Sequence, residues 1–191
     1  QKELEQWMEY ATRYNRRGTL LFIDLDKFKY VNDSHGHGAG DQYLSSVATL
    51  LTKTLRSTDL VARWGGDEFA AFLPETVGVE AHSVGNKLLD TLAKAKFEFN
   101  GVAFQPSASI GLASMPDHTV DASELIIFAD AAMYEAKKAG RGCWRLYAAS
   151  DAEVQYIQEH LHWETRIRRA LENDQFLLLY QPCFFYFKLS Q

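Results

Sequence analysis

A Gly-Gly-Asp-Glu turn between two apolar runs constrains the fold of this chain more than any other feature. The runs occupy residues 60–62 and 69–73. This pattern predicts a β-hairpin with the carboxylates of Asp67 and Glu68 at its tip. Gly65 and Gly66 permit positive φ angles and have no Cβ that would block a close ligand. Such a turn can present backbone N–H groups and carboxylates to a phosphate and its metal ion, although an ordinary tight turn would use the same residues.

A second acidic motif ends an upstream apolar run at residues 19–26. Strand alternation puts Asp24 and Asp26 on one face, with Leu25 opposite. Carboxylate oxygens suit Mg²⁺, which usually takes one or two protein carboxylates together with substrate phosphates. Asp24 with an acid of the hairpin would supply such a site, and we expect Asp24 and Asp67 at the surface. A pair of solvated strand-end acids is the other interpretation.

The composition fits a folded enzyme domain rather than a membrane or nucleic-acid-binding protein. The 191 residues suffice for one domain and part of another. They are 47% hydrophobic but contain no apolar run of about 18 residues, so we expect a cytoplasmic chain without membrane contact, any anchor lying outside it. The net charge of −5 argues against nonspecific nucleic-acid binding. It does not argue against a nucleotide, because local Lys and Arg can hold phosphates.

The order of the expected elements is mixed. Hydrophobic periodicity predicts helices over about residues 1–17, 39–56, 79–95 and 122–139, and strands over about residues 19–25, 102–113 and 144–147. Asp121 or Ser123 is the expected cap of the last of these helices. Helices packed on a mostly antiparallel central sheet give an α+β, ferredoxin-like arrangement.

Several motifs together resemble the GGDEF domain, the diguanylate cyclase family, in order and spacing over roughly residues 19–147. The motifs that carry the resemblance are residues 24–29, 32–33, 36–41, 63–69, 109–111 and 129–141. The resemblance implies a palm-like cyclase fold. It also implies an enzyme that condenses two GTP molecules into cyclic di-GMP with loss of two pyrophosphates.

In that reaction each 3′-hydroxyl attacks the α-phosphate of the other GTP, so catalysis is mostly positioning and charge neutralisation. By the resemblance, the carboxylates of Asp24 and Asp67 and the carbonyl of Leu25 hold Mg²⁺, or Mn²⁺ in its place, with Glu68 nearby. A second ion would give a two-metal arrangement. Asp67 and Glu68 are the implied catalytic residues, with Asp67 near the 3′-hydroxyl.

Asn32 and Asp41 match the family's guanine-binding pair. A carboxylate can accept from the N1–H and N2–H₂ edge of guanine, which adenine lacks, so Asp41 would select the base. Taken alone, Asp41 reads as an ordinary helix-terminal acid near the positive end of the helix dipole.

The expected phosphate contacts come from two places. Phe28 and Lys29 follow the metal strand, where backbone N–H groups can meet the β- and γ-phosphates. Lys137 and Arg141 lie four residues apart, on one helix face or just past its end, and by the resemblance they contact the terminal phosphates. Without the family pattern they would read as a solvated basic pair.

Arg56 and Asp59 match the family's inhibitory Arg-x-x-Asp site, with five residues between Asp59 and Gly65. Arg can reach guanine O6 and N7, or a phosphate, with a bidentate fork, and Asp59 can accept from another guanine edge. This interpretation predicts inhibition by cyclic di-GMP. The same spacing at a helix end is otherwise a common salt bridge.

The resemblance also suggests assembly and domain organisation. The product is two-fold symmetric, so two domains must face each other as a homodimer. We expect residues 1–149 to be the GGDEF domain, lacking the usual N-terminal segment of the family. Residues 150–191 are similar to a connecting helix and the truncated start of an EAL phosphodiesterase domain, or else form a terminal helix and strand packed on the first domain. A regulatory GTP- or cyclic di-GMP-binding module and a structural dimerisation module are the other functional classes.

Overall fold

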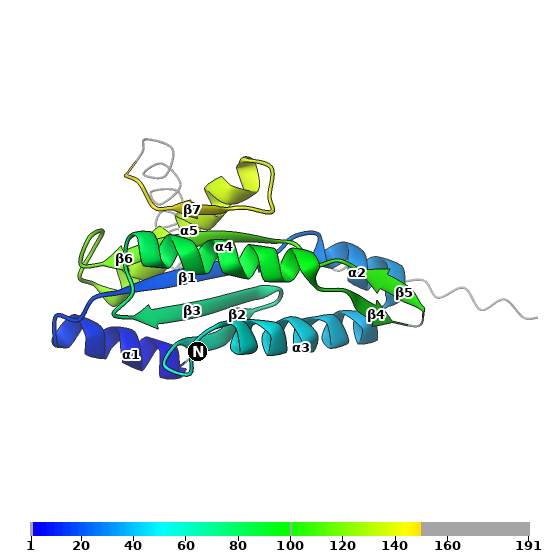
Figure 1. Ribbon diagram of the computed structural model, residues 1–191, viewed down its shortest axis with the longest axis horizontal. Coiled ribbons are helices and arrows are strands. Elements are labelled where there is room, and N and C mark those ends of the chain that lie inside the picture. The colour runs from blue at the N-terminus through cyan, green and yellow to red at the C-terminus, as the bar shows by residue number, and fades with distance from the viewer. Residues whose placement is uncertain (1, 100, 150–191) are drawn as a thin grey trace, which may run out of the picture. The chain divides into compact units, whose positions relative to one another are not determined.

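The computed structural model describes residues 2–99 and 101–149 (Figure 1). The expected EAL-like segment, residues 150–191, lies outside the described residues. The helices are α1 (Lys2–Arg13), α2 (Phe28–His35), α3 (His37–Thr54), α4 (Val79–Lys94) and α5 (Ala122–Lys138). The strands are β1 (Gly18–Leu25), β2 (Leu60–Gly65), β3 (Glu68–Pro74), β4 (Phe97–Phe99), β5 (Val102–Phe104), β6 (Ala108–Met115) and β7 (Trp144–Leu146).

The central sheet has the strand order β2-β3-β1-β6-β7, and β4 pairs with β5 in a separate two-stranded sheet. Strand β1 pairs antiparallel with both β3 and β6, and β2 pairs antiparallel with β3. Among the strands in the described part of the chain, the short β7 alone runs parallel to its neighbour, β6. The predicted α+β fold with a mostly antiparallel sheet is confirmed.

Alternation along β1 divides the core into two layers. Leu21, Ile23 and Leu25 pack into a cluster with buried residues of α3 and α4. Leu20 and Phe22 face the other way, into a cluster built with α1 and α5. Because side chains alternate across a strand, Asp24 falls on the α1 and α5 side of the sheet.

Helix α5 lies unusually close to the sheet because of Gly111 on β6. A Cβ built at Gly111 would overlap the backbone of Ala129 and Met133. The start of α5 is fixed by Asp121, whose carboxylate accepts from the backbone N–H groups of Ser123 at 2.8 Å and Glu124 at 2.9 Å. Of the two expected caps, Asp121 is therefore the residue used.

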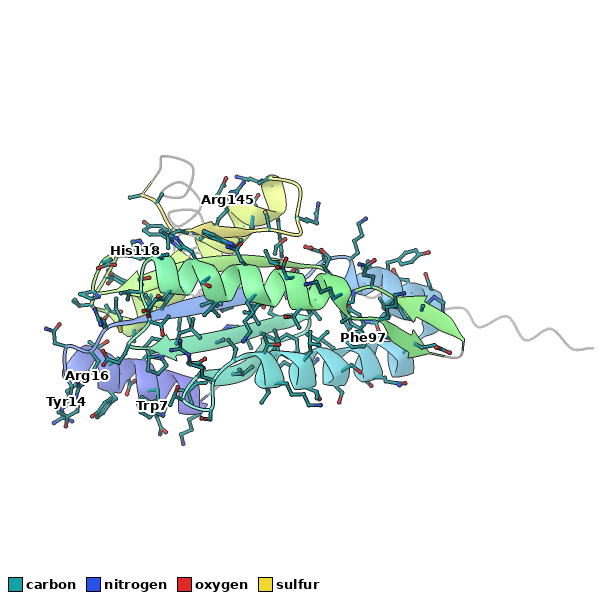
Figure 2. All side chains as sticks on the ribbon, in the orientation of Figure 1. Trp7, Tyr14, Arg16, Phe97, His118 and Arg145 are labelled. Carbon is teal, nitrogen blue, oxygen red and sulfur yellow. The ribbon has the colours of Figure 1, made fainter. Side chains whose placement is uncertain are left out.

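The first helix ends earlier than predicted, at Arg13 rather than near residue 17. Asn15, shortly beyond this end, has a φ of 50°. Only part of the predicted apolar stripe is buried: Met8 is covered, whereas Trp7 is 43% exposed and Tyr14, just beyond the end of α1, is 55% exposed. Figure 2 shows both aromatic side chains on the side of α1 that points away from the sheet.

Two further differences concern short elements. Helix α2 was not predicted, because eight mostly polar residues are too few to show a 3.6-residue period. The strand expected over residues 102–113 is two strands, β5 and β6, separated by a segment that contains Pro106. Proline lacks the N–H that a strand ladder requires.

Candidate functional site

The hairpin of β2 and β3 has the predicted turn at its tip. Gly66 has a φ of 36°, in the range that favours glycine. The guanidinium group of Arg63 donates to the Gly66 carbonyl from Nε at 3.1 Å and from a terminal nitrogen at 2.7 Å, which holds the turn closed. The backbone N–H of Leu25 donates to the Asp67 carbonyl at 3.2 Å, so the tip is tied to the end of β1. The predicted hairpin is confirmed.

Asp24 and Glu68 are direct cross-strand partners of β1 and β3. Asp24 is only 8% exposed, and its carboxylate contacts the Lys137 ammonium group at 2.7 Å. The expectation that Asp24 lies at the surface is therefore wrong. Its position on β1 faces α5, and Gly111 lets that helix approach closely enough to bring Lys137 to it. Asp67, at the hairpin tip, is partly exposed.

The two cross-strand acids sit in an environment that disfavours their charge. Burial raises the pKa of Asp24, an effect that Lys137 opposes and that Asp67 and Asp26 reinforce. Burial also raises the pKa of Glu68, with further increases from the carboxylates of Asp130 and Asp24. Buried acids of this kind favour a nearby cation.

Asp130, on α5, is a site neighbour that was not singled out from the sequence. It acts on Glu68 through its charge. The sequence feature that could have identified Asp130 is its position in the segment 129–141, one of the motifs that carry the family resemblance.

The acidic cluster meets the chemical requirements of a magnesium site that is completed by substrate. Within residues 2–99 and 101–149, no group of three or more His, Cys, Asp or Glu side chains converges as a full metal site. Magnesium needs only one or two carboxylates when phosphates supply the other oxygens. The Lys137 ammonium group beside Asp24 shows that the position accepts a cation. Asp24, Asp67 and the Leu25 carbonyl could therefore hold Mg²⁺, with Glu68 adjacent.

The turn after β1 and the turn after α5 border one pocket of about 500 Å³. Its lining includes Lys27, which has a φ of 60°, and Arg141, which has a φ of 66°. The ring of Phe28 stacks on Tyr43 with centroids 6.1 Å apart, so its side chain faces the core and only its backbone is available to a phosphate. Lys29 is exposed.

Lys137 and Arg141 do not share a helix face. Lys137 lies in the last turn of α5 and pairs with Asp24. Arg141 follows the helix end and is exposed on the pocket. Of the two alternatives that the spacing left open, the second holds: the pair straddles the end of the helix.

The expected guanine-binding residues come from neighbouring helices. Asn32 lies on α2 and Asp41 on α3. A Cβ at Gly40 would overlap the Asn32 side-chain amide, so glycine lets Asn32 approach the residue beside Asp41. Asp41 is exposed and lies beyond the first turn of α3, which contains no acid. Because the dipole effect fades beyond the first turn, the helix-terminal interpretation of Asp41 loses support.

Arg56 and Asp59 form a tight turn after α3. The Asp59 carboxylate accepts from the Arg56 backbone N–H at 2.8 Å, and no side-chain ion pair joins the two among the described residues. Both line a pocket of about 250 Å³ together with Lys87 of α4. Lys87 was missed because nothing in its local sequence connects it with Arg56. Arg56 is exposed.

In the described part of the chain, no helix has the length and apolar character needed to cross a membrane.

Comparison with known proteins identifies the family. The family described as "Diguanylate cyclase, GGDEF domain" matches residues 1–143.

Three relatives illustrate the range of that family. The bifunctional diguanylate cyclase/cyclic di-GMP phosphodiesterase MucR of Pseudomonas aeruginosa is 39% identical over 180 residues, which are 94% of this chain and 26% of MucR. The crystal structure of the GGDEF domain of TpbB from Pseudomonas aeruginosa superposes with a TM-score of 0.72 at 36% identity, covering 78% of this chain and 93% of that one. The coiled coil and GGDEF domain of DgcB from Caulobacter crescentus, in complex with cyclic di-GMP, gives a TM-score of 0.65 at 26% identity, covering 76% and 77%.

The chain thus spans about a quarter of the length of MucR. Family profile, sequence identity and fold agree over the part of the chain that contains the hairpin, the buried acids and the two pockets. This protein belongs to the GGDEF domain family.

Proposed function

We propose that this chain is a diguanylate cyclase domain that converts two GTP molecules into cyclic di-GMP and two pyrophosphates. The observation that carries the proposal is the cluster of Asp24, Glu68 and Lys137 beside the hairpin tip, where two partly or fully buried acids meet one cation. The site combines hard oxygen ligands with a basic group next to a pocket bordered by Lys27 and Arg141. These are the parts that phosphoryl transfer requires.

Each residue has a proposed task. Asp24, the Leu25 carbonyl and Asp67 hold Mg²⁺, which when bound neutralises phosphate charge. Asp67 is partly exposed at the hairpin tip, where it can receive the proton of an incoming 3′-hydroxyl, and Glu68 supports it. The backbone of Gly65 and Gly66 leaves room for the nucleotide.

The remaining residues bind and orient GTP. Asn32 and Asp41 hydrogen-bond the guanine edge, which adenine cannot satisfy in the same way. The N–H groups of Phe28 and Lys29 meet the β- and γ-phosphates. Lys137 and Arg141 contact the terminal phosphates. Two copies facing each other bring each 3′-hydroxyl to the opposite α-phosphate.

We also propose that the pocket of Arg56, Asp59 and Lys87 takes cyclic di-GMP as a feedback inhibitor. The exposed Arg56 side chain supports this proposal. The Asp59 carboxylate accepts from the Arg56 backbone N–H, and within the described residues the Arg56 guanidinium group forms no ion pair, so it is available to a ligand. The relative DgcB was solved with cyclic di-GMP.

A second candidate function is a nucleotide-binding module that regulates an attached phosphodiesterase domain. The observation that favours it is the similarity to PdeR of Escherichia coli, named only as a cyclic di-GMP phosphodiesterase, which is 36% identical over 168 residues, or 88% of this chain.

One experiment separates the two functions. The chain is incubated with GTP and Mg²⁺, and the product is identified by mass spectrometry. Cyclic di-GMP from the wild type, with a loss of roughly 10³-fold or more in Asp67→Asn, supports the cyclase. Asp90→Asn, which changes an exposed acid on α4, is the matched control and should keep full activity. GTP binding without any product would favour the regulatory module instead.

A further inference from the structure

The carboxylate of Asp26 is the centre of a polar junction. Its Oδ2 accepts from the Ser107 hydroxyl at 2.5 Å and from the Gly142 backbone N–H at 3.0 Å, and its Oδ1 accepts from the Ser109 hydroxyl at 2.7 Å. The backbone N–H of Asp26 also donates to the Ser107 carbonyl at 2.9 Å. One side chain thus joins three segments that are far apart in sequence: the end of β1, the start of β6 and the turn after α5.

The two outer segments carry proposed phosphate contacts. Asp26 immediately precedes Lys27, which has a φ of 60°, and α2 begins at Phe28. Gly142 immediately follows Arg141, which has a φ of 66°. Asp26, Lys27, Arg141 and Gly142 all line the same pocket of about 500 Å³. The hydrogen bond from Gly142 to Asp26 therefore spans the pocket wall between the two phosphate-binding turns.

A carboxylate is well suited to this junction. It is an acceptor-only group with room for several donors, and hydrogen bonds to a charged acceptor are stronger than neutral ones. Arg141 is a non-glycine residue in the left-handed region, a conformation that persists only when the surrounding contacts hold it. The bond from Gly142 to Asp26 is such a contact, one residue away from Arg141.

We infer that Asp26 is a positioning residue for the nucleotide's β- and γ-phosphates, acting by tying the turn that carries Arg141 to the start of α2. The inference rests on the proposed GTP site and adds a residue that was assigned no role there. Loss of the carboxylate leaves both turns present but frees the Arg141 turn to move. Binding of the terminal phosphates then weakens, whereas binding of the guanine base, through Asn32 and Asp41, does not change.

The test compares two nucleotides by calorimetry in the presence of Mg²⁺. 3′-Deoxy-GTP has the terminal phosphates and cannot cyclise, and GMP has the base without the β- and γ-phosphates. Asp26→Ala is expected to weaken 3′-deoxy-GTP binding by about tenfold, the scale of one lost hydrogen bond to a charged group. Its GMP affinity should match the wild type. Asp26→Asn keeps an oxygen that can face both Ser107 and Gly142, so it should recover most of the affinity.

A double-variant cycle tests whether Asp26 acts through Arg141. If it does, Asp26→Ala combined with Arg141→Ala should bind 3′-deoxy-GTP no more weakly than Arg141→Ala alone. The variant Ser107→Ala with Ser109→Ala keeps the carboxylate and the Gly142 bond, so it should fold normally and lose affinity in the same direction by a smaller factor. Thermal melts of every variant accompany the titrations.

Three outcomes would overturn the inference while leaving the GTP site intact. They are unchanged 3′-deoxy-GTP binding in the Asp26 and serine variants, an equal loss for GMP and 3′-deoxy-GTP, and additive effects in the cycle. Failure of the wild-type chain to bind 3′-deoxy-GTP is a different result. It would overturn the proposed GTP site, and this inference with it.

Discussion

The carboxylate of Asp24 meets the ammonium group of Lys137 at 2.7 Å rather than open solvent. Burial raises the pKa of Glu68, its cross-strand partner, and the nearby carboxylates of Asp130 and Asp24 raise it further. At the scale of single residues the site therefore holds charge that disfavours the folded state. Such strain is common where function requires a particular charge arrangement.

Glu68→Gln should raise stability at neutral pH and abolish or strongly reduce cyclisation. A raised folded-state pKa means that the folded chain keeps a proton that the unfolded chain has lost. Stability is therefore lost as pH rises from the ordinary pKa of a glutamate through the folded-state pKa. The gain from Gln should be largest above that window and vanish below it. Chemical denaturation in EDTA, repeated at a series of pH values from below the ordinary pKa of a glutamate up to neutral pH, measures this, and a gain independent of pH would contradict the electrostatic explanation.

Arg56→Ala should relieve inhibition by cyclic di-GMP without lowering the uninhibited rate. The Arg56 guanidinium lines the pocket with Lys87, whereas the turn itself depends on the Arg56 backbone N–H, which alanine retains. Initial rates at several product concentrations give the inhibition constant, and the pattern should be noncompetitive with GTP. Arg145→Ala, a change at another exposed arginine labelled in Figure 2, is the control. Equal inhibition of wild type and Arg56→Ala would remove this pocket from the proposal.

At the scale of elements, the contact between α5 and β6 places the basic group of the site. Helix α5 approaches the strand where Gly111 has no side chain, and the far end of the same helix carries Lys137 to Asp24. Asp121 caps the near end of the helix. The helix is thus fixed at its start and packed directly on the sheet before it reaches the buried acid.

Gly111→Ala should destabilise the domain by about 1–3 kcal/mol, the usual cost of overpacking, or by more. The added Cβ would meet backbone atoms of Ala129 and Met133, which cannot rotate away as a side chain can. Gly38→Ala in α3 is the matched control, because a Cβ there meets nothing within 4 Å, and it should be neutral or slightly stabilising. Urea denaturation of the three proteins compares them, and equal midpoints for Gly111→Ala and wild type would refute the close-packing argument.

At the scale of the whole molecule, one domain offers a single set of proposed GTP contacts, whereas the proposed product joins two nucleotides symmetrically. A two-fold arrangement of two copies satisfies this with one surface. The contact between copies need not be large, because bound GTP can bridge it. Association would then limit the rate at low protein concentration.

Specific activity should accordingly rise with protein concentration, and fusion to a parallel coiled-coil dimer should raise it further by increasing the effective concentration. Rates per molecule measured from nanomolar to tens of micromolar protein, with mass measured under the same conditions, provide the test. A fusion to a monomeric protein of similar size controls for solubility. Flat activity per molecule with a monomeric mass would exclude the two-domain mechanism.

The hairpin, the main helices and the family could be predicted from local sequence patterns, because each depends on residues close together in the chain. The turn at Gly65 and Gly66 and the cap at Asp121 need only neighbouring N–H and carbonyl groups. Helix α2 and the break at Pro106 were missed, since short polar helices and interrupted strands carry a weak periodic signal.

Local pattern was enough to identify the groups of the site, which are the acids Asp24, Asp67 and Glu68 and the basic pair Lys137 and Arg141. How these groups meet depends on the folding of the whole domain. It buried Asp24, paired it with Lys137, placed Arg141 on the pocket beyond the end of α5 and made Asp26 the junction of three segments. Hydrogen bonds and interactions between charges depend on distance in space. The distance between Lys137 and Asp24 follows from how α5 packs on β6, which no short stretch of the chain specifies.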